Sequence, residues 1–249
     1  MSELFSIQLQ NRQQQGRDGV WLDLPTTTEQ VQAALRQIGI SSDNPQGLFI
    51  SGYFAEEEKR FAIPYNMVLA SNVDELNFLA SRLETLSAGE RAELNAALQA
   101  PQSELFSIGR ITDFPENVDY YVHLPDVHGP AQLGDYYLNR SGMVDMPEEW
   151  KGGIDTAQFG RYVAQQEQGV FTEYGYLVKS GDAWQKVHEG QPVPEEYRVL
   201  SFPAPEVLRD SANIPPPVQP ETEPQKVIPI ILNGKDSAER MKEITDRLE

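Results

Sequence analysis

The chain of 249 residues contains no cysteine. This absence excludes disulfide bonds, thiolate metal sites and cysteine nucleophiles, and it fits a reducing compartment such as the cytosol. No stretch approaches the roughly 20 apolar residues of a membrane-spanning helix. The N-terminus lacks the basic region and apolar run of a secretory signal. We therefore expect a cytoplasmic protein that does not contact a membrane.

The sequence also lacks the motifs of common enzyme classes. Neither G-x-x-x-x-G-K-[S/T] nor a G-x-G-x-x-G after a strand is present, so no phosphate-binding loop is predicted. There is no G-x-S-x-G nucleophile motif. His123, Asp126 and His128 could gather around a metal ion, but a proline-containing loop between the histidines does not fix a coordination geometry. We expect no enzyme activity, no metal and no cofactor.

Basic residues are scarce: 20 lysines and arginines stand against 38 acidic residues, giving a formal net charge of −18. Proteins that bind DNA need a basic surface, so we expect no direct nucleic-acid binding and a partner whose own surface is basic. The stretch from Asp113 to Glu173 holds eleven acidic residues, Glu167 among them, against three basic ones, a net charge of −8. A merely solvated face is the alternative to a binding role. The other ten form the predicted partner-binding surface: Asp113, Glu116, Asp119, Asp126, Asp135, Asp145, Glu148, Glu149, Asp155 and Glu173.

One six-residue sequence, SELFSI, occurs twice, at Ser2–Ile7 and at Ser103–Ile108. Each copy is followed at nearly the same distance by an aromatic and aliphatic segment that ends in Leu-Pro. These segments are Gly19–Pro25 and Asp119–Pro125. Both stretches read as strand, loop and second strand, so the sequence predicts two related β units.

Hydrophobic spacing and turn residues predict the individual elements. In the first part we expect strands Leu4–Leu9 and Val20–Leu24, a helix between the capping box Thr26-x-x-Glu29 and Gly39, and a hairpin of Leu48–Phe54 with Arg60–Tyr65. In the middle we expect two helices that turn back on each other: Ser71–Leu86, and Ala92–Ala100 after the capping box Ser87-x-x-Glu90. In the last part we expect a helix opened by Pro130, a helix at Asp155–Gln165, and a hairpin of Val170–Lys179 with Ala183–His188 around Ser180 and Gly181.

These elements predict an α+β protein with small domains in a row, which gives an elongated body. The predicted domains are a first α+β unit (1–70), a helical unit (71–102) and a second α+β unit that carries the acidic stretch (103–200). A proline-rich linker (201–226) and a strand–helix tail (227–249) follow. The tail begins with the apolar run VIPIIL, Val227–Leu232, followed by a predicted charged helix. This pattern predicts either an element that docks on a partner or the beginning of a further domain.

Six motifs occur in the order seen in one known family. GVWLDL, LFISGYF, DELNFLASRLETLSAGERAELNAAL, LGDYYLNRSG, FGRYV and FTEYGYL together resemble the ArdA antirestriction proteins of plasmids, transposons and phages. The resemblance runs from about Leu4 to Leu177. Two departures are that Thr156, Ala157 and Gln158 follow Asp155 where the family has a tyrosine–acidic pair, and that the first loop is longer and rich in glutamine.

The resemblance implies an elongated three-domain homodimer that imitates bent B-form DNA and occupies the DNA groove of a type I restriction–modification enzyme. Apolar side chains near the acidic stretch are candidates for the dimer interface: Tyr136, Tyr137, Trp150, Phe159 and Tyr162. Two alternatives remain at this point. One is an acidic decoy for another nucleic-acid-handling defence, such as a CRISPR effector, whose channel is also basic. The other is a non-catalytic interaction protein of a mobile element.

Overall fold

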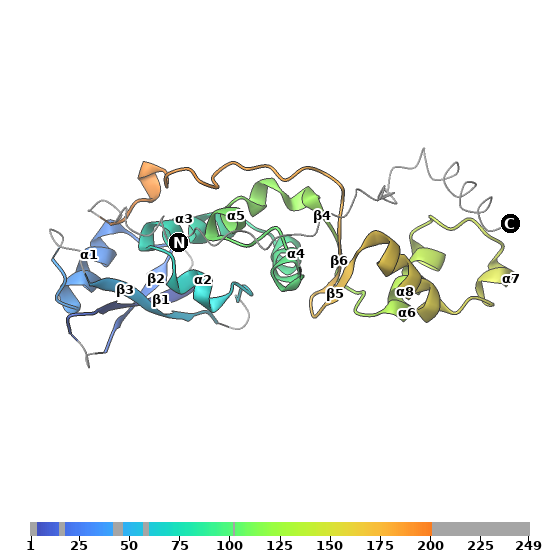
Figure 1. Ribbon diagram of the computed structural model, residues 1–249, viewed down its shortest axis with the longest axis horizontal. Helices are drawn as coiled ribbons and strands as arrows, with labels where there is room; N and C mark the ends of the chain where they lie inside the picture. Colours follow the sequence, from blue (N-terminus) through green and yellow to red (C-terminus); the bar gives the residue numbers. More distant parts are fainter. Residues whose placement is uncertain (1–3, 15–17, 42–46, 57–59, 102, 201–249) are drawn as a thin grey trace, which may run out of the picture. The chain divides into compact units, whose positions relative to one another are not determined.

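The computed structural model describes residues 4–14, 18–41, 47–56, 60–101 and 103–200 (Figure 1). Helices and two three-stranded sheets form a mixed α+β fold, as predicted. The described chain divides into two compact units. Unit 1 holds residues 4–98, 103–116 and 185–200, and unit 2 holds residues 99–101 and 117–184. The row of three domains stays a prediction, and the predicted linker (201–226) and tail (227–249) lie outside the described residues. None of the described helices is long and apolar enough to cross a membrane.

The sheet of unit 1 contains β1 (Phe5–Asn11), β2 (Val20–Leu24) and β3 (Leu48–Phe54) in the antiparallel order β2-β1-β3. Alternate residues of β1 are buried, as a sheet with one covered face requires. Helix α1 (Thr28–Gln37) packs beside β2. Its capping box is formed by Thr27 and Gln30, one residue later than predicted. Gly39, with a φ of +68°, follows the helix as predicted.

The predicted strand at Arg60–Tyr65 is wrong. Residues 60–64 have no regular structure, and α2 (Tyr65–Leu69) begins after Pro64. The side chain of Asn95 takes the place of a strand partner: its Oδ1 accepts the N–H of Ala62 at 2.8 Å and its Nδ2 donates to the carbonyl of Arg60 at 3.1 Å. Backbone groups satisfied in this way need no neighbouring strand.

The two predicted helices in the middle of the chain are present as α3 (Val73–Leu83) and α4 (Ala88–Gln99). Helix α3 begins with a capping box of Asn72 and Glu75, and the predicted capping box of Ser87 and Glu90 is confirmed at the start of α4. Leucines on the inner faces are fully buried at 0% exposure: Leu76, Leu79, Leu83 and Leu94.

The two SELFSI copies have different structures, so the predicted β duplication is wrong. The first copy runs into β1, where Ser6 donates to Asp23 of the neighbouring strand. The second copy is a loop that leads into α5 (Ile108–Thr112), with Ser107 accepting the N–H of Arg110 as the N-cap. The same residues therefore form a strand where two neighbouring strands pair with it, and a helix cap where none does.

Unit 2 contains the strands β4 (Tyr121–Leu124), β5 (Val170–Thr172) and β6 (Gly175–Lys179) in the antiparallel order β4-β6-β5. Its helices are α6 (Pro130–Asp135), which Pro130 opens as predicted, a π-helical turn at Tyr136–Arg140, α7 (Glu148–Lys151) and α8 (Thr156–Glu167). Short 3₁₀ turns lie at Phe114–Glu116 in unit 1 and at Val118–Tyr120 in unit 2.

The predicted final hairpin is placed differently. Its turn lies at Glu173 and Tyr174, between β5 and β6, and not at Ser180 and Gly181. Residues 183–188 form no strand. They begin a return segment, residues 185–200, that leaves unit 2 and rejoins unit 1, where its 3₁₀ turn Glu195–Tyr197 contacts α3 (orange in Figure 1).

Buried polar side chains of unit 1 hold the return segment in place. Asp113 accepts the N–H groups of residues 187, 188 and 189, and Asp74 accepts those of Val199 and Leu200 at 2.7 and 2.8 Å. Asn77 donates to the carbonyl of Tyr197 at 2.9 Å. A segment without regular structure satisfies its backbone groups through such side chains.

Candidate acidic interface

Two of the ten carboxylates predicted to form the acidic surface are engaged inside unit 1. Asp113 is fully buried, and its oxygens accept three backbone N–H groups of the return segment. Glu116 is half-buried and forms an ion pair with Arg82 of α3. Both side chains therefore stabilise unit 1, and Asp113 does not contribute to an exposed surface.

The other eight predicted carboxylates lie in unit 2, most of them at the ends of its helices and in its turns. Asp126 lies in the turn after β4, Glu148 and Glu149 open α7, and Glu173 lies in the β5–β6 turn. Asp155 caps α8 by accepting the N–H groups of residues 157 and 158. Seven of the eight are exposed and Asp135 is half-buried. We call the exposed set the unit 2 carboxylates: Asp119, Asp126, Asp145, Glu148, Glu149, Asp155 and Glu173.

Unit 2 keeps a clear negative excess. From Asn117 to Trp184 it holds ten acidic and four basic residues, a net charge of −6. Asp182, which the sequence argument did not single out, adds a further exposed carboxylate. Two acidic residues form ion pairs on short helical spacing, Asp135 with Arg140 at 2.7 Å and Glu148 with Lys151 at 3.1 Å.

Hydrogen bonds from neighbouring side chains lower the pKa of one of these carboxyl groups. The side-chain hydrogen bond from Asn139, followed by the one from Arg140, lowers the pKa of Asp135. Asp135 is therefore already ionised when the pH exceeds the ordinary pKa of an aspartate. Glu148 remains 81% exposed in its ion pair, so its carboxylate is still open to a partner.

The eleventh acidic residue of the stretch, Glu167, is half-buried and hydrogen-bonded to two tyrosines of unit 2. Glu167, at the end of α8, accepts the hydroxyl protons of Tyr137 at 2.5 Å and Tyr176 at 3.0 Å. Burial raises its pKa, and the two tyrosine hydrogen bonds oppose that shift. The cluster of buried apolar residues around it comprises Val127, Leu133, Tyr137, Val163 and Tyr176.

Two glycines allow α6 and α8 to approach backbone to backbone. A Cβ atom added at Gly160 of α8 would lie 1.8 Å from the carbonyl oxygen of Pro130, and one at Gly134 of α6 would lie 1.9 Å from that of Thr156. No side chain fits at either position without moving the backbone. This contact fixes the start of α8, and with it Asp155, against α6.

The five residues predicted to form the dimer interface differ in their solvent exposure. Trp150 and Tyr162 are 68% and 55% exposed. Tyr137 is buried, and Tyr136 and Phe159 are half-buried against the core cluster of unit 2. Trp150 and Tyr162 are therefore the two that offer substantial apolar area to another molecule.

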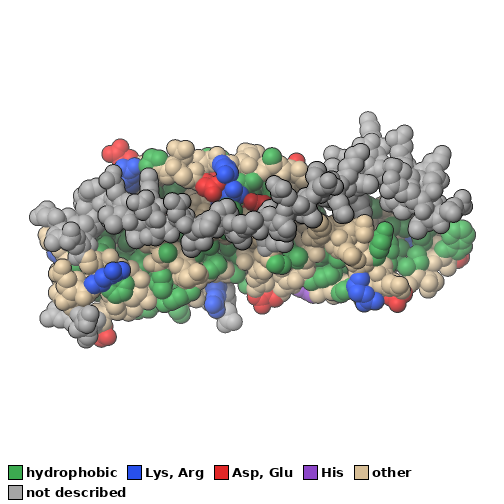
Figure 2. All heavy atoms as spheres, in the orientation of Figure 1, with side chains coloured by type: hydrophobic (Ala, Val, Ile, Leu, Met, Phe, Trp, Pro, Cys, Tyr) green, Lys and Arg blue, Asp and Glu red, His purple; other side chains and the backbone are tan. Residues whose placement is uncertain are grey.

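The candidate metal ligands show no metal-binding arrangement. A ring nitrogen of His123 lies 2.7 Å from the carbonyl oxygen of Tyr174, within hydrogen-bonding distance. In the part of the chain that the structure describes, no group of three or more histidine, aspartate or glutamate side chains is placed to hold a metal ion. Figure 2 shows that on one face the acidic side chains form separate small groups between apolar and uncharged ones.

Comparison with known proteins supplies the identity of the chain. A model of the antirestriction protein family ArdA matches residues 15–178, well over half of the sequence. Among curated proteins no match is found. The matched range runs from β2 to the penultimate residue of β6, includes all the unit 2 carboxylates, and ends before the return segment. The chain therefore belongs to the ArdA family of antirestriction proteins.

Proposed function

We propose that the protein is a non-catalytic, cytoplasmic inhibitor that imitates DNA and occupies the DNA-binding groove of a type I restriction–modification enzyme. The family supplies the antirestriction function. The observation that supports mimicry is the net charge of −6 on unit 2, with seven of its predicted carboxylates exposed. Duplex DNA carries about one negative charge per 1.7 Å of helix axis. A groove that binds DNA is therefore complementary to a dense row of negative charges.

The carboxylates stand in for phosphates in this proposal. They are presented by ordered elements, so little conformational entropy is lost when a basic groove binds them. Complementary charge also accelerates encounter, because oppositely charged surfaces steer each other before contact. The inhibitor acts stoichiometrically, by competition with DNA, and it neither binds DNA nor turns over a substrate.

We further propose that two copies pair through Trp150 and Tyr162. Aromatic residues are enriched at protein interfaces. Trp150 lies on α7, which also carries Glu148 and Glu149, and Tyr162 lies on α8, which Asp155 caps. Pairing at this position doubles the number of carboxylates offered to one target.

Competition against a DNA duplex, measured at two salt concentrations, tests the proposal. The wild type is compared with the triple variant Asp145→Asn, Glu148→Gln, Glu149→Gln in unit 2. A matched control neutralises three exposed carboxylates of unit 1: Asp18, Glu195 and Glu196. Each exposed charge is worth up to about 1 kcal/mol, so the unit 2 triple variant weakens binding by at most roughly a hundredfold and the control leaves it unchanged.

The salt dependence separates mimicry from other modes of binding. Real DNA gives a log–log slope of about −0.9 per neutralised phosphate. A protein surface of lower charge density condenses fewer ions, so the inhibitor gives a negative but shallower slope on the same target. A salt-independent affinity, turnover at substoichiometric inhibitor, or retention of a DNA duplex by the inhibitor alone would each overturn the proposal.

A further inference from the structure

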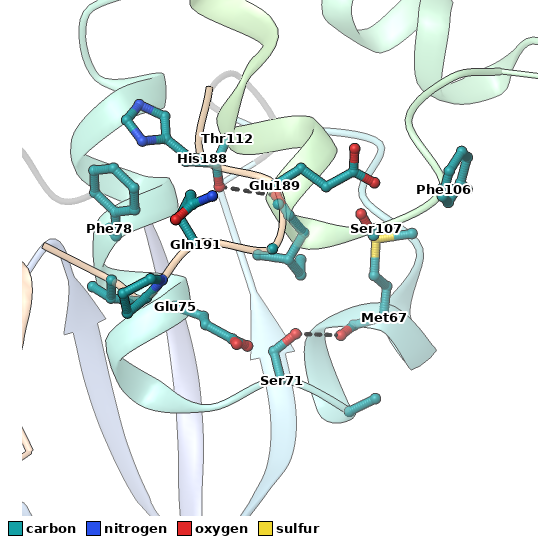
Figure 3. A pocket seen from close by; sticks show the side chains of 16 residues that line it. Met67, Ser71, Glu75, Phe78, Phe106, Ser107, Thr112, His188, Glu189 and Gln191 are labelled. Atoms are coloured by element: carbon teal, nitrogen blue, oxygen red, sulfur yellow. Dashed lines mark hydrogen bonds between the residues drawn. The ribbon is translucent and has the colours of Figure 1, made fainter. Parts of the chain in front are cut away.

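A pocket of about 640 Å³ opens within unit 1 (Figure 3). Helices α2 and α3, the loop before α5 and the return segment each provide part of its lining. Figure 3 shows Met67 and Phe106 on one side of the space and Phe78 on the other. Ile108 and Val193 add further apolar surface. This volume is typical of pockets that hold a ligand or several side chains.

The polar groups of the lining are largely committed to the protein itself. The hydroxyl of Ser71 donates to the carbonyl of Met67 and that of Thr112 donates to the carbonyl of Ile108, both at 2.8 Å. The ring of His188 packs edge-on against Phe78, with centroids 4.9 Å apart. Glu189 is paired with Arg110 and Lys186. An occupant is therefore offered mainly apolar contact, together with the carboxylate of Glu75 on the lining.

One aromatic side chain of the lining is left open to solvent. Phe106 is 63% exposed, and the guanidinium of Arg110 lies over its ring at 4.7 Å. Its counterpart in the first SELFSI copy, Phe5, is only 2% exposed. An exposed phenylalanine beside an apolar pocket marks a surface that a partner segment can cover.

The return segment ties this pocket to the end of the chain. Residues 188–193 form part of the lining, and they lie beyond residues 15–178, the part matched by the family. Farther along, Val199 and Leu200 are bound to Asp74, the residue that precedes Glu75 in α3. Leu200, the last described residue, is therefore held next to a residue of the pocket lining.

We propose that the apolar run Val227–Leu232 of the same chain docks in this pocket. It is the longest uninterrupted apolar run in residues 201–249. The 26 residues between Leu200 and Val227 reach about 28 Å as a flexible coil and about 80 Å if extended. Either distance suffices to return to a pocket that starts near Asp74. Such a tether gives an effective concentration of about millimolar.

Charge favours the same occupant. Lys226 immediately precedes the apolar run and Lys235 follows it closely. Glu75 on the lining carries the opposite charge, whereas the carboxylate of Glu189 is already paired with Arg110 and Lys186. The run itself has no charged residue, so it meets the apolar lining while a flanking lysine faces the carboxylate of Glu75.

The absence of cysteine allows a direct test in the full chain. Asn233→Cys places a single nitroxide label just after the apolar run. In the ¹⁵N-labelled protein the label broadens the backbone amide signals of Ala70, Gly109 and Gly190, which line the pocket. The same label in a chain that also carries Ile228→Ser, Ile230→Ser and Ile231→Ser gives no such broadening.

Paired substitutions on the pocket side provide the control. Phe106→Ser removes the exposed ring beside the pocket and reduces the broadening, whereas Phe54→Ser, an equally exposed phenylalanine of unit 1 outside the lining, leaves it unchanged. Equal signals with and without the three serines would overturn the proposal. Broadening in a ¹⁵N-labelled chain without cysteine, caused by a spin-labelled second copy, would also overturn it, because docking would then occur between copies.

Discussion

The carboxylate of Asp113 accepts the backbone N–H of His188 at 2.6 Å, across 75 residues of sequence. The N–H groups of Val187 and Glu189 donate to the same carboxylate, each at 3.2 Å. A side chain that the charge pattern placed on an acidic surface is thus the anchor of the return segment. An ionised acceptor makes stronger hydrogen bonds than a neutral one, so this anchor contributes to the stability of unit 1.

Asp113→Asn therefore destabilises unit 1. The amide group presents a donor to N–H groups that need an acceptor, and the expected loss is about 1.5–3 kcal/mol. Urea unfolding measures it, with Asp119→Asn, the removal of an exposed carboxylate, as the control. Equal unfolding midpoints for the two variants would show that the Asp113 contacts add nothing.

Glu167→Gln is expected to flatten the pH dependence of the stability of unit 2. Burial raises the pKa of Glu167 above its ordinary value of 4.5, so the folded state binds the proton more readily than the unfolded state. The stabilisation that this proton brings is full below the ordinary pKa and is lost as pH rises through the raised one. Glutamine can still pair with Tyr137 and Tyr176, and it does not titrate.

The measurement is the unfolding free energy as a function of pH, from below the ordinary value of 4.5 up to neutral pH. The wild type is expected to lose more stability over this interval than the variant. Burial also raises the pKa of Asp74 in unit 1, which is present in both proteins and cancels in the comparison. A variant that loses as much as the wild type would contradict the assignment to Glu167.

Gly160→Ala is expected to disrupt unit 2. The added Cβ would lie 1.8 Å from the carbonyl oxygen of Pro130, so α6 and α8 must separate, at a cost of about 1–3 kcal/mol or more. In an unobstructed helix the same change would stabilise by about 1 kcal/mol, so even the sign is informative. Gly152→Ala, where nothing lies within 4 Å of the added atom, is the control. Thermal melting of both variants gives the answer.

Trp150→Ser with Tyr162→Ser is expected to shift a dimer toward monomer. The two side chains are the exposed members of the predicted interface, and buried aromatic residues dominate the energy of protein interfaces. Light scattering over a dilution series reports the mass. The control replaces Trp21 and Phe54, two exposed aromatic residues of unit 1, with serine. A wild type that is monomeric throughout would contradict the proposed pairing.

Local signals in the sequence predicted the helices well. Ser87 with Glu90, and Asp155 alone, cap α4 and α8 as their sequence context indicates. Pro130 opens α6. Each of these interactions joins residues within one helical turn, and the inward leucines of α3 repeat at helical spacing, so both can be recognised in one short window.

Errors arose where distant residues decide the structure. The local pattern of Arg60–Tyr65 predicted a strand, but no strand pairs with this segment among the described residues. The side chain of Asn95, distant in sequence, satisfies the backbone near Ala62 instead. The second SELFSI copy has no neighbouring strands and forms a helix cap. For the acidic surface, composition predicted the negative excess of unit 2, but it could not separate the exposed carboxylates from Asp113, whose partners lie far along the chain.

The position of the return segment in the sequence also affects the order in which the two units can be completed during synthesis. Unit 1 starts with β1 and is completed by residues 185–200, so unit 2 is an insertion within its chain. The backbone groups that bind Asp74 and Asp113 leave the ribosome after all of residues 117–184. Domains generally fold as units during synthesis. In this chain unit 2 can therefore fold before unit 1 is complete. A nascent chain interrupted near residue 184 contains all the described residues of unit 2 but lacks the return segment of unit 1.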